Sequence, residues 1–266
     1  YEYWPILGTL RVERVYMIVF IIMVMVSEHK RWIKSPVNAC VGVFVAVLTF
    51  SSFFAFNVGE SLDLLIDYLK YVVFYVVVVL SINNKKDFRN IILIFLAVMF
   101  LYVGKSAWEF FVNGRYEFTM GIKRMVGVDM TYGAPNSFAA SICYSLPFVW
   151  AVIRFGEYKK WIRLALWSYG ALAVVSIIYT GSRSGMATLL LFFVLAVFSS
   201  SKKVIALLVM GALLVIGWDF IPADLQTRFI STYEKGHAPA SADESAEGRL
   251  AGFLQGAKVF AQHPLL

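Results

Sequence analysis

Residues 136–198 decide the class of this chain, and they read NSFAASICYSLPFVWAVIRFGEYKKWIRLALWSYGALAVVSIIYTGSRSGMATLLLFFVLAVF. Three long apolar runs fill this stretch, separated by a basic loop and by a short turn that contains Gly, Ser and Arg. An α-helix rises about 1.5 Å per residue, so a run of about 20 apolar residues can cross the hydrocarbon layer of a membrane. The pattern continues through most of the chain and predicts an all-α fold, a polytopic bundle of transmembrane helices.

The composition of the whole chain agrees with lipid as its main surroundings. Of its 266 residues, 60% are hydrophobic and 15% are charged, and the mean hydropathy is +0.72. Soluble domains have roughly half apolar and a quarter charged residues. A soluble core also does not require runs of about 20 apolar residues between short basic clusters. The composition therefore excludes an ordinary soluble domain.

Working outward from the quoted stretch, we expect about eight spans. The N-terminal boundary of the first span is not defined by the sequence, because charged residues interrupt the apolar pattern before residue 15. The expected spans cover residues 15–26, 36–56, 62–80, 91–112, 136–155, 162–180, 185–198 and 204–221.

The cations indicate how these spans are oriented. The formal net charge is +7, and half of the 24 lysine and arginine residues lie in the loops after the first, third, fifth and seventh spans or within two residues of them. By the positive-inside rule these loops face the cytoplasm, so the turn near residue 183 and the tail after residue 221 face outside. Cations in short loops report orientation more than a polyanionic partner, so we expect no nucleic acid as a partner.

Two regions follow from this topology. Residues 1–221 form a transmembrane helical domain, and residues 222–266 form an extracytoplasmic loop. Within that loop, residues 248–260 have the spacing of an amphipathic helix that lies beside the membrane lipid.

The sequence predicts no metal site and no cofactor. Cys40 and Cys143 lie within apolar runs without metal-ligand spacing, as small buried hydrophobic residues do. The three histidines form no HExxH pattern, and there is no GxSxG nucleophile motif.

The turn at the start of the seventh span is the strongest candidate for chemistry. It places Ser182 and Arg183 between two glycines, at a helix N-terminus whose N–H groups and dipole favour an anion. The planar guanidinium of arginine also suits phosphate. The alternative is a tight turn whose arginine reaches lipid headgroups.

A second cluster, residues 123–137, leads into the fifth span. Pro135 suits the first turn of a helix, and Asn136 or Ser137 suits a cap, so a helix start explains the cluster as structure. As function, Arg124 and Asn136 face the same outer surface as Arg183 and add donors to one anionic pocket.

A third candidate is Arg249, which follows the acidic residues 243–247. Acids before a helix favour its dipole, which explains the acids as structure. An arginine at a helix start is unfavourable in the same field, and this makes Arg249 a candidate ligand.

Taken together, four motifs resemble the O-antigen ligase/polymerase superfamily. They are GAPNSFA at 133–139, TGSRSG at 180–185, SAEGRL at 245–250 and HPLL at 263–266. The order and spacing of the motifs carry the resemblance, which covers the chain from about Arg124 onward.

The resemblance implies a GT-C-like membrane glycosyltransferase of the bacterial inner membrane with a periplasmic active face. Such an enzyme takes a glycan from an undecaprenyl pyrophosphate carrier and passes it to a glycan, lipid or protein acceptor. Carried over, Arg183 and Arg249 clamp the pyrophosphate, and Ser182, Arg124 and Asn136 assist. The family's catalytic histidine is expected beyond the C-terminus, because neither His237 nor His263 has a matching context.

Two other function classes stay open. A transporter or flippase of lipid-linked glycans fits the many spans, but the sequence has no inverted repeat and no pair of helices broken by Gly or Pro. A scaffold subunit of an envelope complex leaves the Gly-Ser-Arg-Ser-Gly turn unexplained. Within the family, the sequence does not separate ligase, polymerase and protein glycosylation.

We expect the 266-residue chain to be inactive as a transferase by itself, because no residue in it matches the family's base. Turnover of a lipid-linked glycan by this chain in reconstituted membranes would contradict that expectation.

Overall fold

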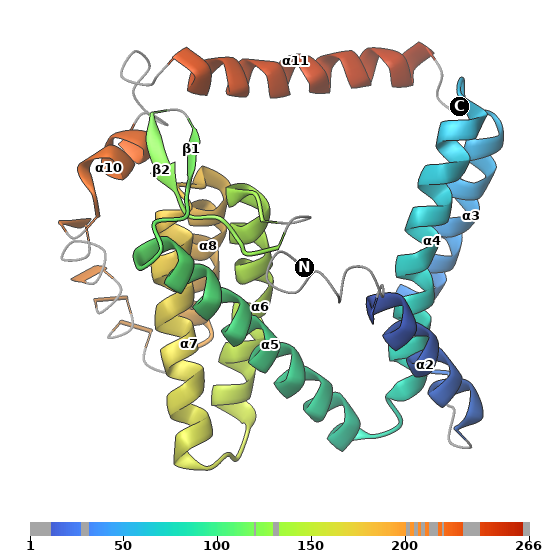
Figure 1. Ribbon diagram of the computed structural model, residues 1–266, viewed down its shortest axis with the longest axis horizontal. Helices are drawn as coiled ribbons and strands as arrows, with labels where there is room; N and C mark the ends of the chain where they lie inside the picture. The colour runs from blue at the N-terminus through green and yellow to red at the C-terminus, as the bar shows by residue number, and fades with distance from the viewer. Residues whose placement is uncertain are drawn as a thin grey trace. The chain divides into compact units, whose positions relative to one another are not determined.

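The protein is an all-α membrane protein with several helices long enough to span a membrane. A computed structural model describes residues 12–27, 32–119, 121–129, 133–200, 203–204, 207–208, 211–212, 218–219, 221–230 and 240–262. The elements are α2 (Val12–Val26), α3 (Pro36–Phe53), α4 (Val58–Ser81), α5 (Lys85–Phe111), β1 (Glu117–Thr119), β2 (Ile122–Arg124), α6 (Pro135–Phe155), α7 (Lys160–Tyr179), α8 (Arg183–Phe198), α10 (Ala223–Ile230) and α11 (Ala240–Gln262) (Figure 1).

Among the described residues, five helices, α3 to α7, are long and apolar enough to cross a membrane. The expectation of a polytopic helical bundle is therefore confirmed. The first and seventh expected spans correspond to two shorter apolar helices, α2 and α8. The eighth expected span, 204–221, lies largely outside the described residues, so the total of eight stays a prediction.

Local sequence explains where several helices begin. The hydroxyl of Ser35 accepts a hydrogen bond from Val37 N, and Pro36 occupies the first helical position of α3. Asn57 caps α4 in the same way, by accepting from Glu60 N. Short polar side chains satisfy N–H groups that a helix leaves unpaired in its first turn.

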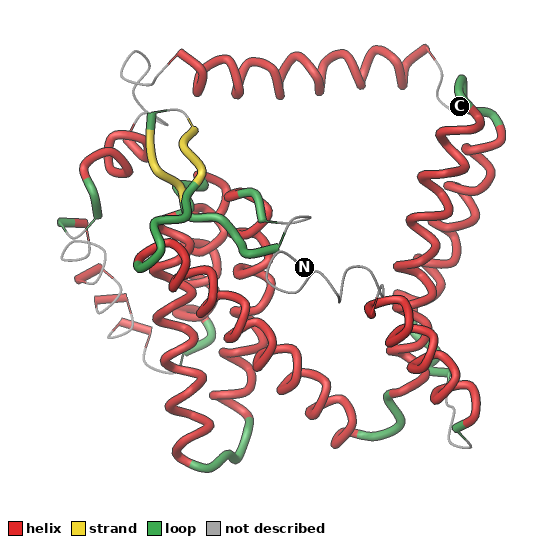
Figure 2. The backbone as a smooth tube through the Cα atoms, viewed as in Figure 1, coloured by secondary structure: helices red, strands yellow, loops and turns green. Residues whose placement is uncertain are grey.

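Two features differ from the sequence-based expectation. Residues 117–124 form a β-hairpin (Figure 2), whose strands pair Glu117 with Arg124 and whose turn contains Gly121 at φ +76°. Strands of three residues are too short for a period-2 pattern to predict them. In addition, α11 begins at Ala240 rather than at 248, because its acidic residues lie inside the first turns of the helix instead of before them.

The chain forms two compact units, and one of them comprises Tyr1–Ile91 with Gln255–Leu266. Here α3 packs on α4, and an edge-to-face contact joins the rings of Phe44 and Tyr68 at 5.7 Å. The hydroxyl of Tyr75 donates to Asn38 Oδ1 between the same two helices. Most large apolar side chains of α3 are exposed, as expected for a helix that faces lipid.

The second unit, Ile92–Leu254, contains the main buried core. Its core side chains come from four helices: Leu96, Met99 and Val103 of α5, Phe138, Ile142 and Leu146 of α6, Leu166, Tyr169 and Ile177 of α7, and Leu189 of α8. Small residues bring α6 and α8 together, since a Cβ on Gly185 would lie 2.8 Å from that of Ala139. The thiol of Cys143 donates to the carbonyl oxygen of Gly185 at 3.6 Å. Small residues allow this close approach between membrane helices.

We expect Gly185→Ala to destabilise the protein because the new methyl group overlaps Ala139. Gly170→Ala in α7 is the matched control, since its Cβ would have nothing within 4 Å. Relative to this control, the overlap should cost about 1–3 kcal/mol. The midpoint of thermal unfolding in detergent, followed by tryptophan fluorescence, measures the difference. Equal midpoints for the two variants would show that α6 and α8 are not packed this closely.

Candidate functional site

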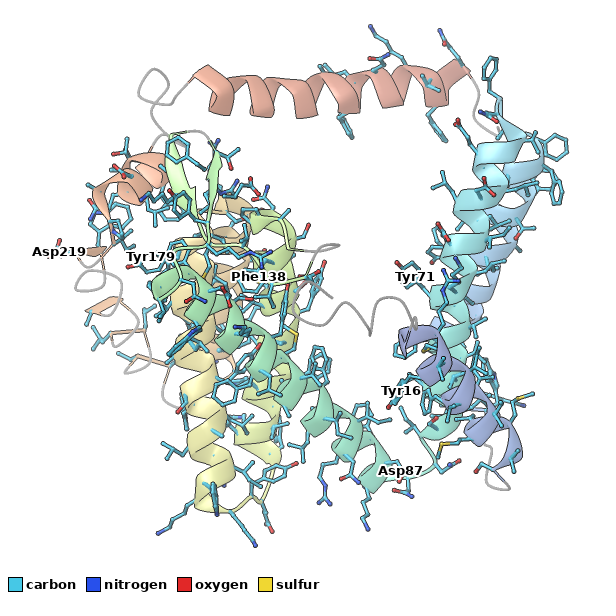
Figure 3. All side chains as sticks on the ribbon, viewed as in Figure 1. Tyr16, Tyr71, Asp87, Phe138, Tyr179 and Asp219 are labelled. Carbon is cyan, nitrogen blue, oxygen red and sulfur yellow. The ribbon has the colours of Figure 1, made fainter. Side chains whose placement is uncertain are left out.

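Four of the five candidate residues, Arg124, Asn136, Ser182 and Arg183, lie at one end of the second unit. Because α6, α7 and α8 alternate in direction, α6 begins, α7 ends and α8 begins at this end (Figure 1). Tyr179 and Phe138, labelled in Figure 3, mark it. The β-hairpin joins the same end, where Met125 N donates to the carbonyl oxygen of Tyr179 at 2.9 Å. The basic loop at 156–159 lies at the opposite ends of α6 and α7.

Arg124, the last residue of β2, connects three elements at this end. Its side chain is buried, with 4% of its surface exposed. Its Nε donates to the carbonyl oxygen of Thr180 at 2.7 Å, and its Nη2 donates to Asn136 Oδ1 at 2.8 Å. The guanidinium therefore bridges the C-terminal end of α7 and the first turn of α6.

The turn from α7 to α8 is built from three residues with separate tasks. Thr180 ends α7, and its hydroxyl donates to the carbonyl oxygen of Ile177 at 2.6 Å and accepts from Ser182 N at 3.2 Å. Gly181 has φ +59°, a left-handed conformation that glycine adopts without strain. Ser182 caps α8, because its Oγ accepts from Gly185 N at 3.2 Å.

Arg183 is the first residue of α8 and is half-buried. It lies where the N-terminal N–H groups and dipole of the helix favour negative charge. Ser182, by contrast, is fully buried, and its hydroxyl is used by the cap and by a 3.2 Å contact with Ser184 Oγ. Of these two residues, Arg183 is the one placed to reach a ligand.

Asn136 is exposed in the first turn of α6. Its side-chain oxygen must face Arg124, since a guanidinium only donates hydrogen bonds. The amide nitrogen of Asn136, which carries two donors, therefore points away from Arg124. Ala134 supplies no side-chain cap to α6, so this helix start also carries donors that no cap occupies.

The loop between the hairpin and α6 is held close to α5. The hydroxyl of Tyr102 donates to Asp129 Oδ1, and Val128 N donates to Ser106 Oγ at 3.2 Å. Gly127 N donates to the carbonyl oxygen of Gly133 at 2.8 Å, which closes the loop.

A buried carboxylate ends α5 at the same end of the unit. Glu109 is 5% exposed, forms an ion pair with Lys105 at 2.5 Å and accepts from Asn113 Nδ2 at 2.9 Å. Sequence reasoning did not single out Tyr102, Lys105 or Glu109. A lysine and a glutamate four residues apart at the end of an apolar run were the signal that would have found the ion pair.

The electrostatics at this end favour an anion. Burial lowers the pKa of the Arg124 guanidinium, and the charge of Glu117, its partner across the hairpin, raises it again in part. The two acceptors of Arg124, Thr180 O and Asn136 Oδ1, are neutral. A buried cation with neutral acceptors gives a positive local potential, to which Arg183 adds.

The remaining sequence candidate, Arg249, lies within α11. It is the tenth residue of the helix that begins at Ala240, so the argument that it opposes the dipole at a helix start is wrong. Its side chain lies outside the described residues. His237 and His263 also lie outside them. Among the described residues, no group of three or more His, Cys, Asp or Glu side chains is placed to hold a metal ion.

One comparison with known proteins bears on this site. A family model described as O-antigen ligase matches residues 168–266. The match covers the C-terminal part of the chain and supports its membership of the O-antigen ligase superfamily. The matched residues include α8 and α11, and with them Arg183 and Arg249, whereas Arg124 and Asn136 precede the match. No curated protein and no solved structure matches the chain.

The O-antigen ligase match confirms the resemblance inferred from the sequence motifs over the matched residues. Together with the apolar helices it identifies a multi-pass membrane protein, and the family indicates glycan transfer as its function.

We expect Gly127→Ala to disturb the loop beside this site, because its Cβ would lie 2.1 Å from the Tyr102 hydroxyl. Thermal unfolding should shift to lower temperature, and the double variant Gly127→Ala/Tyr102→Phe should recover part of the shift by removing that hydroxyl. Gly104→Ala, which has open space within 4 Å, is the control. If the double variant were no more stable than Gly127→Ala alone, the predicted contact would be wrong.

Proposed function

We propose that this O-antigen ligase superfamily member is a glycosyltransferase that uses an undecaprenyl pyrophosphate-linked glycan. The acceptor is a hydroxyl group of a lipid A core, a growing polysaccharide or a protein. The reaction takes place on the periplasmic side of the bacterial inner membrane. The family match supports glycan transfer, and the donor, the acceptor class and the membrane face are our proposal.

The observation that carries this proposal is Arg183 at the first position of α8. A guanidinium, a helix N-terminus and the left-handed turn at Gly181 coincide within the matched residues. The guanidinium and the helix N-terminus each favour a phosphate, and the turn at Gly181 brings the chain from α7 into this helix start. An arginine that only contacts lipid headgroups would not require the buried hydrogen bonds of Thr180 and Ser182 in this turn.

The proposed reaction needs little more than positioning and charge. The acceptor hydroxyl oxygen attacks the anomeric carbon of the glycan, and the bond from that carbon to the phosphate oxygen breaks. The undecaprenyl pyrophosphate leaves with its electron pair, while a base accepts the hydroxyl proton. Cations that contact the pyrophosphate stabilise the charge that grows on it.

The residues take different parts in this proposal. Arg183 and Arg249 bind the pyrophosphate, and the exposed amide of Asn136 adds a donor. The buried Ser182 contributes by capping α8 rather than by touching the donor. We assign no base to the described residues.

The membrane orientation rests on charge. The basic residues Arg154, Lys159, Lys160 and Arg163 lie at the ends of α6 and α7 that are opposite to Arg183. If the positive-inside rule holds for these helices, Arg183 faces the periplasm.

Arg183→Ala should weaken binding of undecaprenyl pyrophosphate to the purified protein in lipid nanodiscs. We expect a loss of about 2–5 kcal/mol, only partly restored by Arg183→Lys, because lysine keeps the charge but not the planar fork. Titration with the labelled lipid measures the affinity.

Arg154→Ala is the matched control. It removes an arginine from the opposite end of α6, where the guanidinium lies 5.5 Å from the centre of the Trp150 ring. This control should bind like the parent protein. Unchanged affinity in both Arg183 variants would mean that Arg183 contacts lipid headgroups instead of the donor. That result would favour a transporter or flippase of lipid-linked glycans.

A further inference from the structure

The contacts of Arg124 are unlike those of a ligand-binding arginine. Its side chain is almost fully buried, and two of its nitrogens already donate to protein acceptors at 2.7 and 2.8 Å. One acceptor belongs to Thr180, three residues before Arg183, and the other to Asn136 in the first turn of α6. The guanidinium therefore holds other parts of the site instead of presenting its donors to a ligand.

The turn that carries Arg183 depends on the bond to Thr180. The last carbonyl groups of a helix lack partners within the helix and carry partial negative charge. Arg124 Nε supplies both a donor and a positive charge to the Thr180 carbonyl group at the end of α7. The position of Thr180 in turn fixes Ser182, because Ser182 N donates to Thr180 Oγ1. Ser182 then caps α8, the helix that begins with Arg183.

The second bond of Arg124 fixes the neighbouring helix. Its Nη2 holds Asn136 Oδ1 in the first turn of α6. One rigid, planar group thus sets the spacing between the start of α6 and the turn before α8. A lysine has one charged nitrogen without a fork geometry, so it cannot reproduce both directed bonds.

We propose that Arg124 is a positioning residue that holds the Thr180–Ser182 turn, and through it Arg183, in the geometry that binds the pyrophosphate. The proposal rests on the proposed function of Arg183. It replaces the sequence-based hypothesis that Arg124 itself contacts the donor.

A double-mutant cycle tests this role. The variants are Arg124→Lys, Arg183→Ala and their combination, and the measurement is binding of undecaprenyl pyrophosphate to the protein in lipid nanodiscs. Arg124→Lys alone should weaken binding roughly 10- to 100-fold, because a small misplacement costs a large part of a directed interaction. In the Arg183→Ala background the same change should alter affinity by no more than about twofold.

Two further variants keep the test decisive. Thr180→Val removes the hydroxyl that accepts from Ser182 N, and its effect should also disappear in the Arg183→Ala background. It tests the link from Thr180 to Arg183 separately from the two hydrogen bonds of Arg124. Arg183→Lys serves as the background if Arg183→Ala binds too weakly to measure.

Lys123→Gln is the control for charge on the hairpin. Lys123 precedes Arg124, is exposed and lies 4.7 Å from the centre of the Tyr116 ring. This variant should bind like the parent protein, and thermal unfolding of every variant separates loss of binding from loss of fold.

The outcomes distinguish the two proposals. Additive losses for Arg124→Lys and Arg183→Ala would mean that Arg124 acts independently of Arg183, by contacting the donor or by holding Asn136, and its role in positioning Arg183 would be wrong. Equal binding by Arg124→Lys and the parent protein would also overturn it. If Arg183→Ala itself binds normally, the proposed function of Arg183 fails first.

Discussion

The hydrogen bonds of one buried guanidinium organise the candidate site. Arg124 reaches the last turn of α7 and the first turn of α6 from a strand of only three residues. A short hairpin has little stability of its own. Its attachment through Arg124 and through Met125 N is therefore what fixes its place on the helices. The turn before α8 and the start of α6 depend on the same attachment.

A buried arginine is costly unless its donors and its charge are compensated. At this site the acceptors are neutral oxygens, and the one acidic neighbour across the hairpin, Glu117, offsets the burial only in part. Positive charge is thus left in a poorly screened place, next to the helix start that carries Arg183. An anionic ligand bound at this end would compensate the positive charge of Arg124 and Arg183, so the uncompensated charge is consistent with an anion-binding site.

The helices were predictable because their signal is local. Runs such as 36–56 and 136–155 must be apolar along their length to lie in lipid. A hydropathy average over the run detects this without information on which other helices pack against it. The helix ends were harder, since α5 begins at Lys85, within the loop expected between the spans 62–80 and 91–112. The acidic residues before Arg249 were interpreted as preceding a helix, whereas the helix extends through them. Charged and polar residues allow either state, so composition does not decide the boundary.

The candidate site divides in the same way. The sequence by itself determined the membrane class, the helical fold, the turn that begins with Gly181 and the prominence of Arg183, because each depends on residues adjacent in the chain. Only the tertiary structure decided that Arg124 bonds to Thr180 and Asn136, which lie 56 and 12 residues away, and that Ser182 is buried in a cap. Hydrogen bonds of this kind depend on which helix ends meet in space, and hydropathy along the chain carries no information on that meeting.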